Sequence, residues 1–169
     1  SGGAAAFRRF LREEVFPFIE ARYRTEPFRL LIGHSLGGLF AVDTFLREPD
    51  LFGACLAVSP YLVWDNNRYL DAAMKERAAS PHGRIFLSAV LGDEPQLLPA
   101  FQRLKNLLAG RRSPQLEFLF REISECDHET VHPQAVARGL LDIFPDWRLP
   151  PDAAAAGLDG ILRHYKGLS

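Results

Sequence analysis

Hydrophobic residues along the chain follow a helical spacing in some segments and form short continuous runs in others. At positions 7, 10, 11, 15, 18 and 19 they fall on one face of a helix. Pro17 lies inside this pattern and is expected to kink or restart the helix. Helical spacing returns over 39–46, 67–79, 97–108 and 133–144, and a last helix capped by Asp152 is expected through about Tyr165.

Four short apolar runs lie between these helical segments and predict buried strands. They read PFRLLIGHS, FGACLAVSP, RIFLSAVLG and QLEFLFREI. Alternation of strands with helices predicts an α/β fold, with a mostly parallel sheet covered by helices on both faces. We expect residues 1–150 to form this core and residues 151–169 to form a C-terminal helical extension.

Composition and charge narrow the class of protein. Hydrophobic residues make up 47%, charged residues 24%, and the net charge is −1, as is typical of a globular chain. No run of Lys or Arg indicates a nucleic-acid surface, and no apolar stretch approaches the roughly 20 residues that span a membrane. Arg8, Arg9 and Arg12 are expected on the solvated face of the first helix, and Cys55 is expected to be a buried small hydrophobe.

The first predicted strand runs into Gly33-His34-Ser35-Leu36-Gly37, a full G-x-S-x-G between a strand and a helix. In that context the motif predicts a nucleophile elbow with Ser35 as the nucleophile. Side chains at Gly33 and Gly37 are expected to collide with neighbouring backbone. The backbone N–H of Leu36 is expected to donate to a developing oxyanion.

Residues 128–132 read HETVH, which matches the H-E-x-x-H pattern of zinc peptidases. A zinc site needs both histidines on one helix, whereas Pro133 predicts that the helix begins at Pro133 and leaves 128–132 in a loop. We therefore expect no metal here. His128, which follows the last predicted strand, is instead expected to be the general base, and His132 is expected to have a capping or surface role.

The third member of a Ser-His-acid triad should follow the strand RIFLSAVLG, where Asp93 and Glu94 both lie. The residues alone do not choose between these two acids. A Ser–His pair without an acid is the alternative. Asp127 is a poor candidate for orienting the imidazole because it adjoins His128.

Four segments carry a resemblance to a known family: GHSLGGLFAVDTF, VSPYLVWDNNRYL, LGDEP and DHETVHPQAVARGLLDIF. They resemble the esterase family of α/β-hydrolases that includes the enterochelin esterases, their IroE-like relatives and esterase D. The resemblance implies an α/β-hydrolase fold, Ser35 as nucleophile, His128 as base and Glu94 in preference to Asp93 as acid. It also implies that the loop holding Ser59, Pro60 and Trp64 lines the substrate pocket, where Tyr61 would suit an aromatic or polyhydroxylated group.

The same family places several strands before its elbow strand, where this chain has only a helix. The chain is therefore expected to be an N-terminally truncated member, without the second oxyanion donor and with a bare sheet edge.

We expect a serine hydrolase that cleaves small-molecule carboxylic esters through an acyl-enzyme and needs no cofactor. One alternative is an impaired fragment that acts as a scaffold or self-associates into a homo-oligomer through the bare edge. A zinc metallopeptidase is the other alternative.

Overall fold

The sheet at the centre of the molecule has four parallel strands. The computed structural model describes residues 3–68, 71–72, 83–89, 95–110 and 116–167. The strands stand in the order β1-β2-β3-β4, with bounds Leu30–His34, Ala54–Val58, Gly83–Ala89 and Leu116–Glu122. Each predicted strand is confirmed within the described residues, and so is the parallel sheet. Among these residues β1 pairs only with β2, so its outer side forms an edge.

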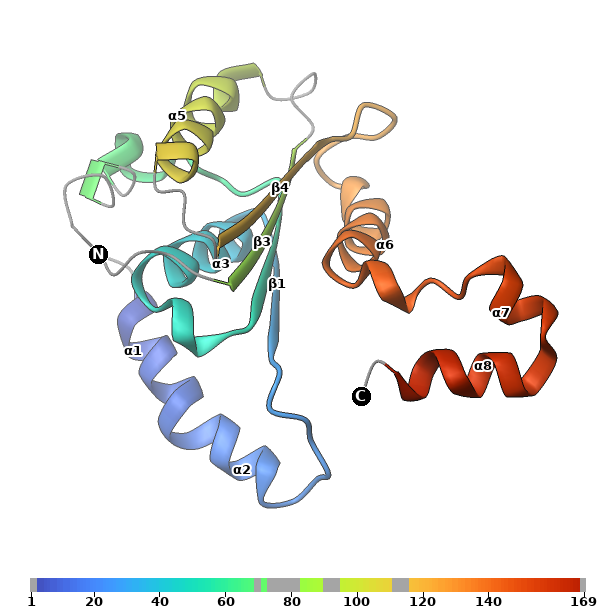
Figure 1. The fold of residues 1–169 in the computed structure, drawn as a ribbon. Helices are drawn as coiled ribbons and strands as arrows, with labels where there is room; N and C mark the ends of the chain where they lie inside the picture. Colours follow the sequence, from blue (N-terminus) through green and yellow to red (C-terminus); the bar gives the residue numbers. More distant parts are fainter. Residues whose placement is uncertain (1–2, 69–70, 73–82, 90–94, 111–115, 168–169) are drawn as a thin grey trace.

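Helices cover both faces of this sheet, as Figure 1 shows. One face carries α3 (Leu36–Arg47) and α5 (Leu98–Gly110), and the other carries α6 (Val131–Ile143). Single helical turns join these elements: η2 (Pro49–Leu51), η3 (Trp64–Asn67), η4 (Pro95–Leu97) and η5 (Pro145–Trp147). The helix predicted over 67–79 falls mostly outside the described residues.

Alternate residues of β2 enter two separate cores, which explains why its sequence is apolar at every position. Cys55 and Ala57 belong to the core below α3 and α5, whereas Ala54, Leu56 and Val58 belong to the core below α6. All five are 0–1% exposed. Burial raises the pKa of the Cys55 thiol to about 12, so this side chain stays protonated and packs as a small hydrophobe, as the sequence indicates.

Helix α6 begins at Val131, two residues before the predicted start at Pro133. Proline fits there because the first four N–H groups of a helix have no partner within the helix, so Pro133 removes no bond. The helix lies close to the sheet at Gly139. A Cβ added at Gly139 would stand 2.4 Å from Cδ1 of Leu56 and 2.8 Å from Cδ1 of Phe86.

The N-terminal helical segment runs from Ala4 to Glu20 and changes type around its proline. It consists of α1 (Ala4–Phe10), a π-helical turn η1 (Leu11–Val15) and α2 (Phe16–Glu20). Pro17 has no N–H with which to bond the carbonyl four residues before it, and the wider π turn lies where that bond would be missing. The predicted interruption is thus confirmed, as a change of helix type ahead of Pro17.

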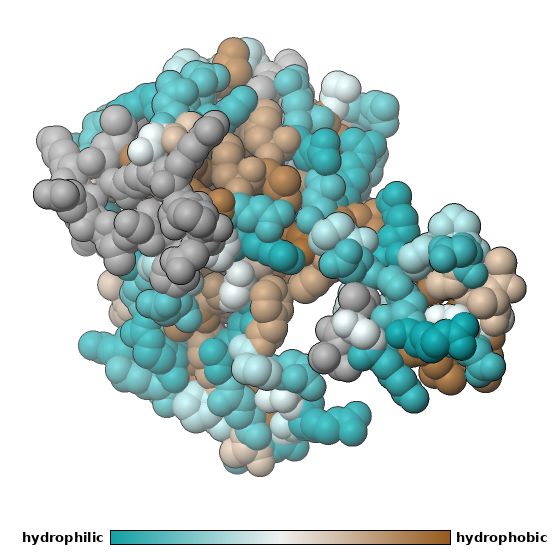
Figure 2. Space-filling view, viewed as in Figure 1, coloured by the Kyte–Doolittle hydropathy of each residue, from teal (hydrophilic) through white to brown (hydrophobic). Residues whose placement is uncertain are grey.

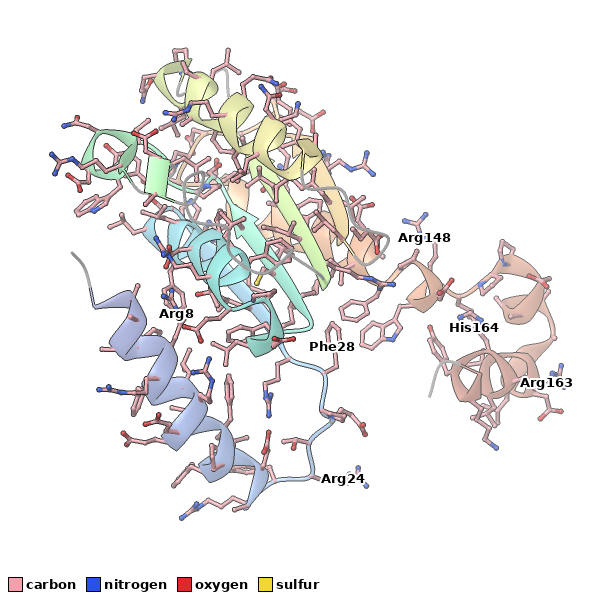
Figure 3. All side chains as sticks on the ribbon, turned by 60° about the vertical axis from the view of Figure 1, so that its left-hand side comes forward. Arg8, Arg24, Phe28, Arg148, Arg163 and His164 are labelled. Atoms are coloured by element: carbon pink, nitrogen blue, oxygen red, sulfur yellow. The ribbon has the colours of Figure 1, made fainter. Side chains whose placement is uncertain are left out.

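The expectation that Arg8 is solvated is wrong. Arg8 is only 4% exposed, and its guanidinium binds Asp43 at 2.5 Å and Glu48 at 2.7 Å. Both partners lie on or just after α3, so these ion pairs join α1 to α3 (Figure 3). Arg12 also pairs with Glu48, whereas Arg9 is exposed. The apolar spacing predicts that the arginines lie opposite the core. Arg8 is buried instead because it pairs with Asp43 and Glu48, which lie 35 and 40 positions later in the chain.

The chain after η5 forms an arm that stands apart from the sheet in Figures 1 and 2. The single helix predicted here is wrong, because α7 (Pro151–Ala155) and α8 (Gly157–Lys166) are separate. Asp152 lies in the first turn of α7, and Pro150 occupies the capping position. Gly157, with a φ of 65°, makes the turn between the two helices. The division of the chain at residue 150 stays a prediction.

None of the helices in the described residues is long and apolar enough to cross a membrane.

We predict that Arg8→Ala lowers the free energy of unfolding by about 1–3 kcal/mol, because it removes the buried guanidinium that joins α1 to Asp43 and Glu48. Urea denaturation followed by circular dichroism measures this change. Arg9→Ala is the matched control one residue away on the same helix, and we expect it to shift the free energy by less than about 0.5 kcal/mol. Equal effects of the two substitutions would contradict the structural role of Arg8.

Candidate active site

Ser35 sits at a sharp turn between β1 and α3 and has a backbone conformation that L-residues rarely adopt. Its φ is 55° and its ψ is −115°. Hydrogen bonds hold this residue on both sides: its N–H donates to the carbonyl of Val58 at 3.0 Å, and its carbonyl accepts from Leu39 at 2.9 Å and Tyr61 at 3.1 Å. A non-glycine residue held there costs about 1–3 kcal/mol, which the surrounding bonds offset. The strained serine on a strand-to-helix turn is the geometry that the G-x-S-x-G motif predicts.

Close backbone packing at this turn explains one glycine of the motif and not the other. A Cβ at Gly33 would lie 2.0 Å from the carbonyl oxygen of Gly37, far inside contact distance. A Cβ at Gly37 would meet nothing within 4 Å, so the expected collision at Gly37 is wrong. Gly38 takes that role instead, because a Cβ there would lie 3.0 Å from both Pro60 Cα and the Val58 carbonyl. The strained dihedral belongs to Ser35, and the glycines provide room.

The predicted base, His128, lies beside the residue that precedes Ser35. His128 comes three residues before α6 and is half-buried, with its Nδ1 enclosed. Nε2 of His34 lies 2.9 Å from the carbonyl oxygen of His128. The two imidazole rings are 4.8 Å apart between centroids. The fold therefore brings the segment that carries His128 to the end of the elbow strand, although the assignment of His128 as a base stays a prediction.

Asp127 shapes the turn that carries His128. Its carboxylate accepts hydrogen bonds from the N–H of Thr130 at 2.8 Å and from the Thr130 hydroxyl at 2.7 Å. The N–H of Val131 donates to the carbonyl of Asp127 at 3.0 Å, which leads directly into α6. The hydroxyl bond from Thr130, followed by the backbone bond, holds the pKa of Asp127 below its usual range. Asp127 is thus engaged in the turn and is not directed at the imidazole beside it.

The two histidines of HETVH are not on one continuous helix, because His128 precedes α6 and His132 lies in its first turn. His132 is exposed, and its Nδ1 lies 3.0 Å from the carbonyl of Glu129, which fits the surface role expected for it. Within the described part of the chain, no group of three or more His, Cys, Asp or Glu side chains is arranged to hold a metal ion.

A cavity of about 510 Å³ opens next to the elbow. Leu36, which is 54% exposed, and Trp64, which is 51% exposed, both line it. The remaining lining residues come from three elements: Ala4, Ala5 and Arg8 of α1, Leu39, Phe40, Asp43 and Arg47 of α3, and Asp65 and Arg68 beside Trp64. The lining thus combines six apolar residues with five charged ones.

The loop between β2 and η3 packs onto the elbow and carries Trp64 to this cavity. Ser59 and Pro60 are buried, and Pro60 lies against Gly38 as described above. Tyr61 is half-buried and is tied to the elbow through its N–H, but it does not line the cavity. Of the residues predicted for the pocket, Trp64 reaches it directly.

Two predicted residues lie outside the described part of the chain, and one contact was missed from the sequence. Asp93 and Glu94 are both in the segment 90–94 that the structure does not describe.

The contact of His34 with the His128 segment was missed, although strand alternation carried the signal. Leu30 packs in the core below α6, and every second residue of a strand shares a face, so His34 points toward the α6 side.

Known proteins resemble this chain in both sequence and fold. The family described as "Putative esterase" matches residues 1–135. An IroE-like serine hydrolase from Shewanella oneidensis superposes with a TM-score of 0.75 at 25% identity, and the BES protein from Bacillus cereus with 0.70 at 28%. They cover 89% and 83% of this chain, respectively. This likeness confirms the predicted α/β-hydrolase fold, with its parallel sheet and helices on both faces.

The relatives are longer proteins. Ferri-bacillibactin esterase BesA from Bacillus subtilis is 45% identical over 65 residues, which is 38% of this chain and 22% of the relative. The chain spans 50% of the Shewanella protein and 54% of the Bacillus cereus protein.

We predict that Gly33→Ala lowers the free energy of unfolding by about 3 kcal/mol or more, because the new methyl group overlaps the Gly37 carbonyl and displaces the elbow. Gly37→Ala is the matched control, with open space around the added methyl group. It occupies the first turn of α3, where alanine favours the helix by up to about 1 kcal/mol over glycine. Thermal and urea unfolding measure both changes, and a Gly33→Ala chain as stable as the parent would refute the steric account.

Proposed function

Because this chain belongs to the putative esterase family, we propose that it hydrolyses carboxylic esters of small molecules, with Ser35 as the nucleophile. One observation carries the proposal: Ser35 has a φ of 55° on a strand-to-helix turn, and the His128 segment is bonded to the neighbouring residue at 2.9 Å. A serine on such a turn, with a histidine-bearing segment from a distant part of the chain bonded to the residue before it, supports an arrangement in which an imidazole activates the hydroxyl.

The proposed reaction proceeds through an acyl-enzyme. His128 removes the proton from the Ser35 hydroxyl as its oxygen attacks the ester carbonyl. The same histidine then delivers that proton to the departing alcohol. In the second half, His128 takes a proton from water, whose oxygen attacks the acyl carbon. The bond from that carbon to the Ser35 oxygen then breaks, and His128 returns the proton to this oxygen, which releases the acid and restores both residues.

The backbone N–H of Leu36 is the proposed oxyanion donor. Leu36 is the first residue of α3, and the N–H of a first helical residue has no acceptor within its own helix. The positive end of the helix dipole stands at the same place, which favours a negative oxygen there. The tight elbow therefore presents the nucleophile and one donor from adjacent residues.

Glu94 is the proposed acid that orients His128, with Asp93 as its competitor and a Ser–His pair as the alternative. The support is their position in the sequence directly after RIFLSAVLG, because in α/β-hydrolases the acid follows the nucleophile and precedes the histidine. A carboxylate would fix the tautomer of the imidazole and stabilise its charged form.

The cavity beside the elbow is the proposed substrate pocket. Trp64 offers a half-exposed indole that can stack on a flat or ring-shaped group, and Leu36 and Phe40 extend the apolar wall. Arg68 adds a positive charge at the same cavity, while Tyr61 is proposed to support the loop that carries Trp64. A volume of about 510 Å³ suits an acyl or alcohol group of drug-like size.

We predict that a fluorophosphonate probe labels the chain at Ser35 and that Ser35→Ala abolishes the labelling. With an activated aryl ester as substrate, Ser35→Ala and His128→Ala each lower kcat/KM by at least about 10³-fold. His132→Ala is the control from the same HETVH segment, and we expect its kcat/KM to stay within about threefold of the parent. EDTA-sensitive peptide cleavage would favour the zinc reading of HETVH, and a folded parent chain that is not labelled would refute the hydrolase.

An unpaired sheet edge favours a second function, self-association. Among the described residues β1 pairs only with β2, and Ile32 on that strand is 44% exposed. Phe28, just before the strand (Figure 3), is 45% exposed and meets the ring of Phe144 edge to face, with centroids 5.4 Å apart. Free N–H and C=O groups on such an edge can pair with the same strand of a second copy, so we propose that this edge forms a homodimer.

We predict that the chain is dimeric at micromolar concentration in size-exclusion chromatography with light scattering, and that Ile32→Lys makes it monomeric. A lysine on an edge strand opposes strand pairing because its charge would be buried. Leu158→Lys on the arm is the matched control, since Leu158 is 70% exposed but lies away from β1, and it should leave the dimer intact. A monomeric parent chain would contradict the edge interface.

A further inference from the structure

We infer that His34 is a positioning residue that joins the His128 segment to the elbow strand and so sets the approach of His128 to Ser35. This inference rests on the proposed hydrolase, in which His128 is the base. The geometry that points to it is a hydrogen bond between two parts of the chain that lie 94 residues apart.

The direction of the His34 side chain follows from its place in β1. Leu30 packs in the core below α6, and Leu31 packs in the core below α3 and α5, so the two faces alternate along the strand. His34, four residues after Leu30, points to the α6 side at the carboxyl end of the strand. The segment that leads into α6 crosses that end, and there the two meet.

The bond from His34 has a defined sense. The carbonyl oxygen of His128 can only accept, so Nε2 of His34 carries the hydrogen and donates it across 2.9 Å. The rings of the two histidines stand 4.8 Å apart at an angle of 39°, which adds a side contact to the hydrogen bond. His34 therefore holds the His128 segment through its backbone carbonyl, at a point one residue before Ser35.

Other hydrogen bonds shape the His128 turn, but they join residues of the turn to one another. Asp127 and Thr130 bond to each other, and Val131 bonds back to Asp127, all inside five consecutive residues. These bonds fix the form of the turn without fixing its distance from β1. The His34 bond spans that distance. Since His34 and Ser35 are adjacent, this bond fixes the position of His128 relative to Ser35.

Alignment of this kind affects turnover more than binding. A displacement of about 1 Å between a catalytic group and its target can lower the rate by about 10²-fold. Binding of the ester depends on the cavity lined by Leu36 and Trp64, which lies beside α1 and α3. Loss of the His34 bond should therefore lower kcat and leave KM nearly unchanged.

The central test is a set of three substitutions. His34→Phe keeps the ring and removes the donor, and we expect kcat to fall by about 10–100-fold with KM within about twofold. His34→Gln places its amide N–H near the position of Nε2 and should recover most of the rate. His34→Asn is too short to reach the carbonyl and should behave like His34→Phe.

The matched control is His164 on α8. Its Nε2 lies 2.8 Å from the carbonyl of Asp146, the same type of bond at a place remote from the elbow (Figure 3). His164→Phe should leave kcat and KM as in the parent chain. If His34→Phe keeps the parent kcat, or if Gln and Asn at position 34 give equal rates, the positioning role is refuted.

A second measurement tests the inference and does not depend on catalytic activity. Amide hydrogen exchange at residues 127–131 should be about tenfold faster in His34→Phe than in the parent chain, while exchange in β2 and α3 stays unchanged. Unchanged exchange at 127–131 would overturn the inference even if turnover fell. If the parent chain proves inactive, the hydrolase proposal fails, and the exchange result still shows whether His34 holds this segment.

Discussion

The strand-to-helix turn at Ser35 depends on the absence of a single side chain. The carbonyl of Gly37 would lie 2.0 Å from a Cβ on Gly33, so the chain can fold back over itself only while position 33 is bare. Everything at the candidate site is placed relative to that turn. It sets the positive φ of Ser35, starts α3 at Leu36 and leaves His34 at the strand end, facing the segment before α6.

The N-terminal helix connects the stability of the chain to its cavity. Arg8 is buried against Asp43 and Glu48, and the same side chain lines the cavity beside Leu36 and Trp64. Helix α1 is thus a wall of the candidate pocket that ion pairs attach to α3. A change that loosens these ion pairs would alter the wall of the cavity as well as weaken the fold.

Local patterns predicted most of the fold, and contacts between distant residues account for what they missed. The apolar runs gave all four strands, and the motif at Ser35 gave the elbow, because both depend on neighbours in the chain. The burial of Arg8 could not be foreseen, since its partners lie on another helix. Likewise, spacing could not tell Gly37 from Gly38, because only Gly38 meets Pro60. The early start of α6 reflects Asp127 and Thr130, whose bonds outweigh the preference set by Pro133.

The order of the strands in the sheet matches their order of synthesis. Each new strand finds its partner in the one made just before it, so the sheet can assemble while the ribosome is still elongating the chain. His34 and His128 are separated by 94 residues, which at ordinary translation speeds is about 5–20 seconds. During that interval the nascent polypeptide carries Ser35 without the segment that bonds to the elbow strand, so the candidate site is complete only after β4 has been made.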